Sequence, residues 1–196
     1  MRMADHARRQ DLLQKGRRLF AASHADSRSM AALAKEAGCS KALLYHHFGN
    51  RRGYYLAVLE DIAREFTAAI EPDPTLPFEA ALQGALGRFL RLAQAEPSTF
   101  RLFVHGGVGV DAEAEALVQG VRDAALVFLR HRLDAGDGPR FRLAAAGWIR
   151  AVETMTEQWI GGGELSADAL LELLETGLES VRVAIRMDRR QARAAS

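Results

Sequence analysis

A short run of hydroxyl, cationic and aromatic residues carries the clearest chemical signal in the sequence. Ser40, Lys41, Tyr45 and His46 fall within seven residues, directly after Gly38 and Cys39. Lysine, tyrosine and histidine side chains contact phosphates and base edges when they lie on the outside of a short helix. The run therefore predicts a surface that lies on duplex DNA.

A helix-turn-helix pair is predicted to position these side chains. Ser29 can cap a first helix, and Gly38 ends it, because glycine takes a left-handed turn without steric cost. Ser40 can cap a second helix that begins at Lys41. The first helix has one apolar face with i, i+3, i+4 and i+7 spacing, formed by Met30, Leu33, Ala34 and Ala37.

The second helix divides into an inner and an outer face. Leu44 and Phe48 lie four residues apart and are predicted to point inward. The side chains predicted to point outward are Ala42, Leu43, Tyr45, His46 and His47. An ordinary helical hairpin with a solvated face is the alternative, and the hairpin by itself does not decide between the two.

The charge distribution favours the DNA-binding interpretation. Residues 1–60 hold 11 lysines and arginines against five acidic residues, whereas the remainder holds 15 against 20. Because phosphate contacts supply most non-specific affinity for DNA, a basic head on an acidic body is typical of a nucleic-acid-binding protein.

The rest of the chain is predicted to be all-α, with nine helices in total. Outside the hairpin, helical periodicity covers about 7–22, 51–70, 77–94, 97–104, 111–133, 139–160 and 166–187. We expect a helix-turn-helix domain at 1–50, an effector-binding and dimerisation domain at 51–188, and a disordered tail at 189–196. A single cysteine, no secretory leader and no membrane-length apolar run favour the cytoplasm.

The last two predicted helices carry apolar residues on more than one face. Leu171, Leu173 and Val183 fall beside or outside the main stripe of the final helix. A central buried helix in a monomer is one explanation, and a four-helix interface of a homodimer is the other, which we favour. The residues expected at that interface are Trp148, Val152, Trp159, Leu170, Leu174, Leu178 and Val181.

Residues 8–60 resemble the DNA-binding domain of the TetR family of bacterial transcriptional regulators. The matching segments are LLQKGRRLF (12–20), SMAALAKEAGCSKALLYHHF (29–48) and YYLAVLED (54–61). The resemblance implies a homodimeric repressor that binds a palindromic operator and is released by a small molecule. It implies DNA contacts at Arg28, Ser29, Ser40, Lys41, Ala42, Leu43, Tyr45, His46 and Arg51. Arg52 departs from the family pattern and is expected to add positive charge toward DNA.

Enzyme, metal and cofactor chemistry are not indicated. The sequence has no CxxC or HExxH motif and no nucleophile elbow, and the adjacent His46 and His47 cannot chelate one ion from one helix face. We therefore expect no cofactor and no metal.

An apolar or amphipathic effector is expected in the body, because ligand pockets are mostly apolar with a few polar groups. The candidate lining residues are Phe66, Phe89, Phe103, His105, Arg122, Phe128, Trp148, Glu153 and Met155. For each aromatic, ordinary core packing is the alternative. A cavity of several hundred Å3 would favour an effector, whereas a tightly packed body would favour a DNA-binding dimer regulated by a partner protein or acting architecturally.

Overall fold

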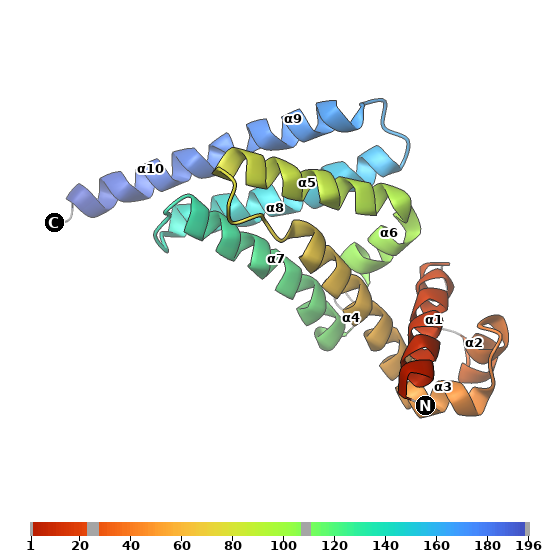
Figure 1. The fold of residues 1–196 in the computed structure, drawn as a ribbon. Helices are drawn as coiled ribbons and strands as arrows, with labels where there is room; N and C mark the ends of the chain where they lie inside the picture. The colour runs from red at the N-terminus through yellow and green to blue at the C-terminus, as the bar shows by residue number, and fades with distance from the viewer. Residues whose placement is uncertain (1, 23–27, 107–110, 195–196) are drawn as a thin grey trace. The chain divides into compact units, whose positions relative to one another are not determined.

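The computed structural model describes residues 2–22, 28–106 and 111–194, and these residues are helical with short connections (Figure 1). No strand occurs among them, which confirms the all-α prediction. In chain order the helices are α1 (Arg2–Ala21), α2 (Met30–Glu36), α3 (Lys41–Phe48), α4 (Arg51–Ile70), α5 (Phe78–Ala95), α6 (Pro97–His105), α7 (Ala112–Arg132), α8 (Pro139–Ile160), α9 (Ala167–Gly177) and α10 (Glu179–Ala194).

The predicted final helix, 166–187, is present as two consecutive segments, α9 and α10. At the junction the N–H groups of Val181 and Arg182 both donate to the carbonyl of Leu178, at 2.9 and 3.2 Å. Counted as one interrupted helix, this pair completes the expected nine-helix layout of the described chain.

The predicted disordered tail, 189–196, is helical as far as Ala194, and residues 195–196 lie outside the described part. Arginine, glutamine and alanine are good helix formers, so α10 continues through them. The guanidinium of Arg189 also donates to the carbonyl oxygen of Asp134 at 2.6 Å, which ties this part of the helix to the loop before α8.

The described residues divide into two compact units. Unit 1 comprises residues 1–65 and 98–118, and unit 2 comprises 66–97 and 119–196. The sequence placed a domain boundary between residues 50 and 51, but in the structure the first part of α4 belongs to the same unit as α1.

A close approach of α1 to α4 explains why the first half of α4 belongs to unit 1. A Cβ atom added to Gly16 would lie 2.5 Å from Val58 Cγ2 and 2.9 Å from Tyr54 Oη. The buried Tyr54 hydroxyl donates to the carbonyl of Leu12 at 2.6 Å, and the Phe20 ring packs edge-on against the Tyr54 ring. Only a glycine at position 16 lets the two helices pack this closely.

A buried ion pair also joins α1 to α4. Arg17 is 4% exposed, and its Nη2 lies 2.6 Å from Asp61 Oδ2, while its Nη1 lies 2.5 Å from Glu65 Oε2. Because the guanidinium is planar with forked donors, it can serve both carboxylates at once.

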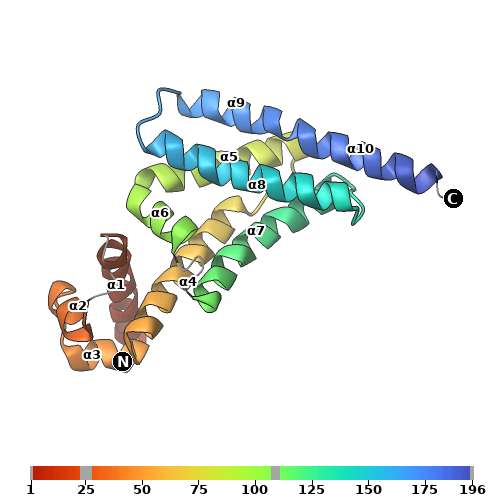
Figure 2. The ribbon, with the colours of Figure 1, turned by 180° about the vertical axis from the view of Figure 1, so that it is seen from behind.

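Unit 2 is built on amphipathic helices. In both views α9 and α10 follow one another end to end, α8 lies alongside them, and α5 packs against α8 and α9 (Figure 2). Their apolar stripes face one another, and Leu86, Phe141 and Leu174 are buried there. Trp148 Nε1 donates to the carbonyl of Leu174 at 2.9 Å, which links α8 to α9. None of the helices in the described ranges has the length and apolarity required to cross a bilayer.

Candidate nucleic-acid interface

The turn between α2 and α3 is fixed by its own backbone hydrogen bonds. Gly38 adopts a φ of +66°. Its N–H donates to Lys35 O at 3.1 Å, and the N–H of Cys39 donates to Ala34 O at 3.0 Å. This is the glycine-closed end that satisfies the last carbonyls of a helix. The turn therefore holds α3 at a set angle to α2.

Serine caps begin both helices, as the sequence predicted. Ser29 Oγ accepts from the Ala32 N–H at 3.2 Å, and Ser40 Oγ accepts from the Leu43 N–H at 3.1 Å. The residues predicted to point inward are all buried: Met30, Leu33, Ala34, Ala37, Leu44 and Phe48. The helical hairpin is thus anchored by its inner face.

The outward face of α3 presents the chemically active side chains. Lys41, Ala42 and His46 are exposed, and Tyr45 is 42% exposed. Lys41 Nζ lies 5.6 Å from the centre of the Tyr45 ring, within range of a cation–π contact. Leu43 is half-buried. This face of α3 therefore presents the Lys41 ammonium, which can contact a phosphate, next to the Tyr45 hydroxyl.

His47 is the exception, because the sequence placed it on the outward face. Its side chain is only 4% exposed and faces Asp5 of α1, with 3.7 Å between His47 Nε2 and Asp5 Oδ1. The N-terminal turns of α1 extend over this side of α3, which the hairpin pattern alone could not indicate.

Both predicted arginine contacts, Arg28 and Arg51, are half-buried. Arg28 donates to Glu36 Oε2 at 2.9 Å, to the carbonyl of Ala22 at 3.1 Å and to the carbonyl of Leu19 at 3.4 Å, so it also holds the hairpin to the end of α1. Arg51 is half-buried in the first turn of α4.

Arg52 is committed to the start of α7. Its Nε lies 2.7 Å from Asp111 Oδ2, and its Nη2 lies 2.8 Å from Glu113 Oε2. The hydrogen bonds from Arg52 lower the pKa of Asp111 to about 2. The expectation that Arg52 directs charge toward DNA is therefore wrong for this structure. No sequence signal near Arg52 indicated its distant carboxylate partners.

Taken together, a capped helix, a glycine turn and an exposed cationic second helix define a helix-turn-helix DNA-binding protein. Comparisons with known proteins agree with this class. Residues 12–58 match the profile described as bacterial regulatory proteins, tetR family, and residues 78–178 match the tetracyclin repressor-like C-terminal domain. The second match alone covers more than half of the chain, so the chain belongs to the TetR family of regulators.

Individual relatives support the same assignment. An HTH-type transcriptional repressor of Streptomyces coelicolor is 25% identical over 155 residues, which is 73% of this chain and 78% of that protein. A solved TetR-family regulator from the same organism shares 26% identity with a TM-score of 0.78, covering 95% of this chain and 86% of the other. A TetR-like regulator from Rhodococcus sp. RHA1 shares 27% identity with a TM-score of 0.71, covering 86% and 91%. The protein is thus a DNA-binding transcriptional regulator and not an enzyme.

Unit 2 contains a small apolar cavity between its helices. Its volume is about 70 Å3. Five of the predicted effector residues line it, namely Phe89, Arg122, Phe128, Trp148 and Glu153. The sequence analysis missed several lining residues, among them Leu82, Leu86, Ala125, Leu129 and Ile149. Their apolar periodicity marks them as core, and nothing in it separates core from cavity wall.

A buried ion pair is the polar feature of this cavity. Arg122 Nε lies 2.8 Å from Glu153 Oε1 and its Nη2 lies 2.9 Å from Glu153 Oε2, and the two side chains are 7% and 12% exposed. This two-point pairing neutralises both charges inside an otherwise apolar wall.

The other four predicted effector residues do not line the cavity. Phe66 is buried and packs on the Phe89 ring at 5.5 Å between centroids. Phe103 and His105 belong to unit 1, and Met155 is 36% exposed. These positions were selected by residue type, which does not determine whether a side chain borders a void.

The side chains predicted at a dimer interface mostly face the chain's own core. Leu170, Leu174 and Leu178 are each 2% exposed and Val181 is fully buried. Trp148 and Val152 line the cavity, and Trp159 Nε1 donates to the carbonyl of Leu165 at 2.8 Å. The richest apolar stripe of an amphipathic helix is buried within its own subunit, so the expected interface residues must be revised.

The excess apolar residues are instead the exposed ones. On α8, Leu143 is 77% exposed, and on α9 and α10 Leu173, Val183 and Met187 are 46%, 40% and 48% exposed. Solvated leucines, a valine and a methionine on neighbouring helices form a surface that a partner can cover.

Proposed function

We propose that the protein is a repressor that binds a palindromic operator as a homodimer, with α3 of each subunit in the major groove. The observation that carries this proposal is the outward face of α3, where Lys41, Tyr45 and His46 stand on a helix fixed by a glycine turn and a serine cap. Bound to chromosomal DNA, such a protein acts in the cytoplasm.

The homodimer part of the proposal rests on the outer faces of α8, α9 and α10. Leu173 and Thr176 on α9, and Ser180, Val183 and Met187 on α10, are spaced by three and four residues, so each set shares one face of its own helix. On α8, Leu143 shares a face with Gly147, whose missing side chain allows a close helix approach. A two-fold arrangement of these helices forms a four-helix interface and supplies two reading helices.

Selection of bound fragments from random DNA, followed by footprinting, tests the operator. We expect an inverted repeat whose half-sites lie about one helical turn apart. Lys41→Ala is expected to weaken binding and to reduce the slope of log affinity against log salt by about 0.9 per subunit, since one phosphate contact is lost.

The control is Arg91→Ala, which removes an exposed cation of α5 in unit 2. Its affinity and salt slope should equal those of the wild-type protein. An asymmetric selected site, or a Lys41→Ala salt slope equal to that of Arg91→Ala, would count against the proposed DNA contact.

For the effector, we infer an amphipathic molecule that enters the cavity of unit 2. Its polar group would replace one partner in the Arg122–Glu153 ion pair. The pair supplies one cationic and one anionic partner in apolar surroundings, where polar groups fix a ligand's orientation. The small volume requires the wall to open on binding. The double variant Arg122→Met with Glu153→Leu, which leaves no buried charge unpaired, is expected to abolish release from DNA by a charged effector and to leave operator affinity unchanged in its absence.

One observation favours the alternative, a dimer without a small-molecule effector. A cavity of about 70 Å3 is far below the roughly 300–1,000 Å3 typical of ligand pockets. Thermal-shift screening with amphipathic compounds separates the two. A compound that raises the unfolding temperature of the wild type but not of the double variant Arg122→Met with Glu153→Leu supports an effector, and the absence of any such compound supports the alternative.

A further inference from the structure

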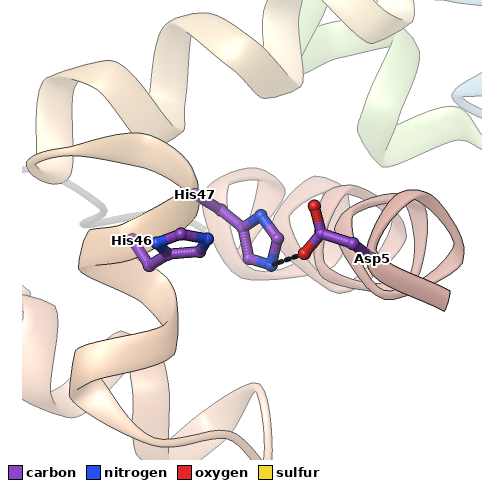
Figure 3. Close-up of side chains that lie close together, drawn as sticks. All are labelled: Asp5, His46 and His47. Carbon is purple, nitrogen blue, oxygen red and sulfur yellow. Dashed lines mark ion pairs between the residues drawn. The ribbon is translucent and has the colours of Figure 1, made fainter. Parts of the chain in front are cut away.

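Three metal-ligating side chains meet where α1 approaches α3 in unit 1. Asp5 comes from α1, and His46 and His47 come from α3, and one candidate ligand atom of each lies within 4.8 Å of the others. Figure 3 shows the His47 ring between the His46 ring and the Asp5 carboxylate. The sequence predicted no metal here, because two adjacent histidines were not expected to chelate one ion from one helix face. In the structure a ligand atom of His46 nevertheless lies within 4.8 Å of one of His47, and a second helix adds a carboxylate.

The buried imidazole of His47 points independently to a ligand at this place. Its side chain is 4% exposed, and its Nε2 atom is buried without a hydrogen-bond partner. Asp5 Oδ1 faces this nitrogen at 3.7 Å, which is too long for a hydrogen bond. Leaving a buried polar atom without a partner destabilises a folded protein. A cation between the nitrogen and the carboxylate would remove that cost.

We propose that Asp5, His46 and His47 form a binding site for a divalent first-row transition-metal ion, with zinc as the representative case. Two imidazole nitrogens and one carboxylate are donors that such ions accept, with water in the remaining position. Magnesium and calcium prefer oxygen ligands, so the two nitrogens select against them.

The site must contract slightly to hold an ion. Zinc–ligand distances of about 2.0–2.2 Å place two ligands of one ion no more than ~4 Å apart. The Asp5 side chain is 64% exposed and His46 is also exposed, so both can change rotamer around the fixed His47 ring. A bound ion clamps α1 to α3 and sets the orientation of His46, which is also a candidate DNA contact.

Equilibrium dialysis of the full, untagged chain against zinc, without DNA, tests the site. We expect one zinc ion per chain. Residues that only hydrogen-bond to a metal's ligands contribute about 10–100-fold to its affinity. Asp5→Asn and His46→Gln remove or weaken direct ligands, so each should weaken zinc binding by at least about tenfold. Both residues are exposed, so neither change removes core packing.

The matched control is His131→Gln, an exposed histidine of α7 outside the cluster. It should bind zinc as the wild type does. Failure of the wild type to bind zinc, or equal binding by the Asp5→Asn, His46→Gln and His131→Gln variants, would overturn the proposal.

Cobalt substitution separates this site from Cys39. We expect a cobalt spectrum without a thiolate charge-transfer band, because the three ligands are nitrogen and oxygen. A strong thiolate band would place the metal on Cys39 and overturn the assignment. Since no DNA enters these measurements, their failure leaves the operator proposal standing.

Discussion

At position 16 the absence of a side chain decides how two helices pack. Gly16 lies in the middle of α1, where glycine is unfavourable to a helix, yet an added Cβ would lie 2.5 Å from Val58 Cγ2. The helix sacrifices local stability so that α1 can lie on α4. The missing Cβ atom of Gly16 thus sets the distance between α1 and α4, the two helices that support the helix-turn-helix pair.

Gly16→Ala is therefore expected to destabilise unit 1 by about 1–3 kcal/mol, because overpacking a core forces its neighbours to shift. Urea unfolding followed by circular dichroism measures this. Gly120→Ala is the control, since no atom lies within 4 Å of its added Cβ and alanine favours a helix by up to ~1 kcal/mol. A Gly16→Ala variant as stable as Gly120→Ala would contradict the packing described here.

At the scale of elements, α1 and α4 are joined by charge as well as by packing. Arg17 is almost fully buried and pairs with Asp61, whose side chain is 10% exposed, and with the more exposed Glu65. Burial disfavours the charged guanidinium, but the hydrogen bonds that Arg17 donates to Asp61 and Glu65 outweigh it and raise the pKa of Arg17. The pair thus holds these two helices together, although it costs desolvation.

Arg17→Met is expected to cost about 3–5 kcal/mol, because it leaves the Asp61 carboxylate buried without its main partner. The double variant Arg17→Met with Asp61→Leu should recover most of that loss, since no buried charge remains. Urea denaturation of the three proteins checks both expectations. Equal stability of the single and double variants would show that the unpaired charge is not what destabilises the protein.

At the scale of the whole molecule, burial within one chain separates core residues from residues that are available to the proposed dimer interface. Leu174 is 2% exposed within its own chain, whereas Leu143 and Val183 are 77% and 40% exposed. An arginine at the first position must enter the core of unit 2, whereas at the other two it points to solvent in the single chain and meets a partner subunit only in the proposed dimer.

Leu143→Arg and Val183→Arg are expected to give folded monomers, because a buried unpaired charge at the interface opposes association. Leu174→Arg is expected to unfold unit 2 instead. Light scattering reports the mass and circular dichroism reports helicity. Two surface variants that both remain dimeric would move the interface to another face, and a fully helical Leu174→Arg dimer would show that its burial is overstated.

Much of the DNA-binding head was determined by sequence alone, because its signals are local. The turn at Gly38 and the caps at Ser29 and Ser40 involve only residues a few positions away in the chain. Helical spacing likewise predicted the burial of Leu33 and Leu44. The assignment of Arg52 to DNA failed because its partners, Asp111 and Glu113, lie about 60 positions away in the chain.

The tertiary structure decided everything that depends on which faces meet. Apolar spacing gave α9 and α10 an amphipathic character, but only packing showed that Leu170 and Leu174 face inward and Leu173 faces solvent. The same holds for His47, which packing turns toward Asp5. Periodicity shows which stripe of a helix is buried, but it does not show which surface covers that stripe. The hydrophobic effect is non-directional, so only long-range contacts decide the covering surface.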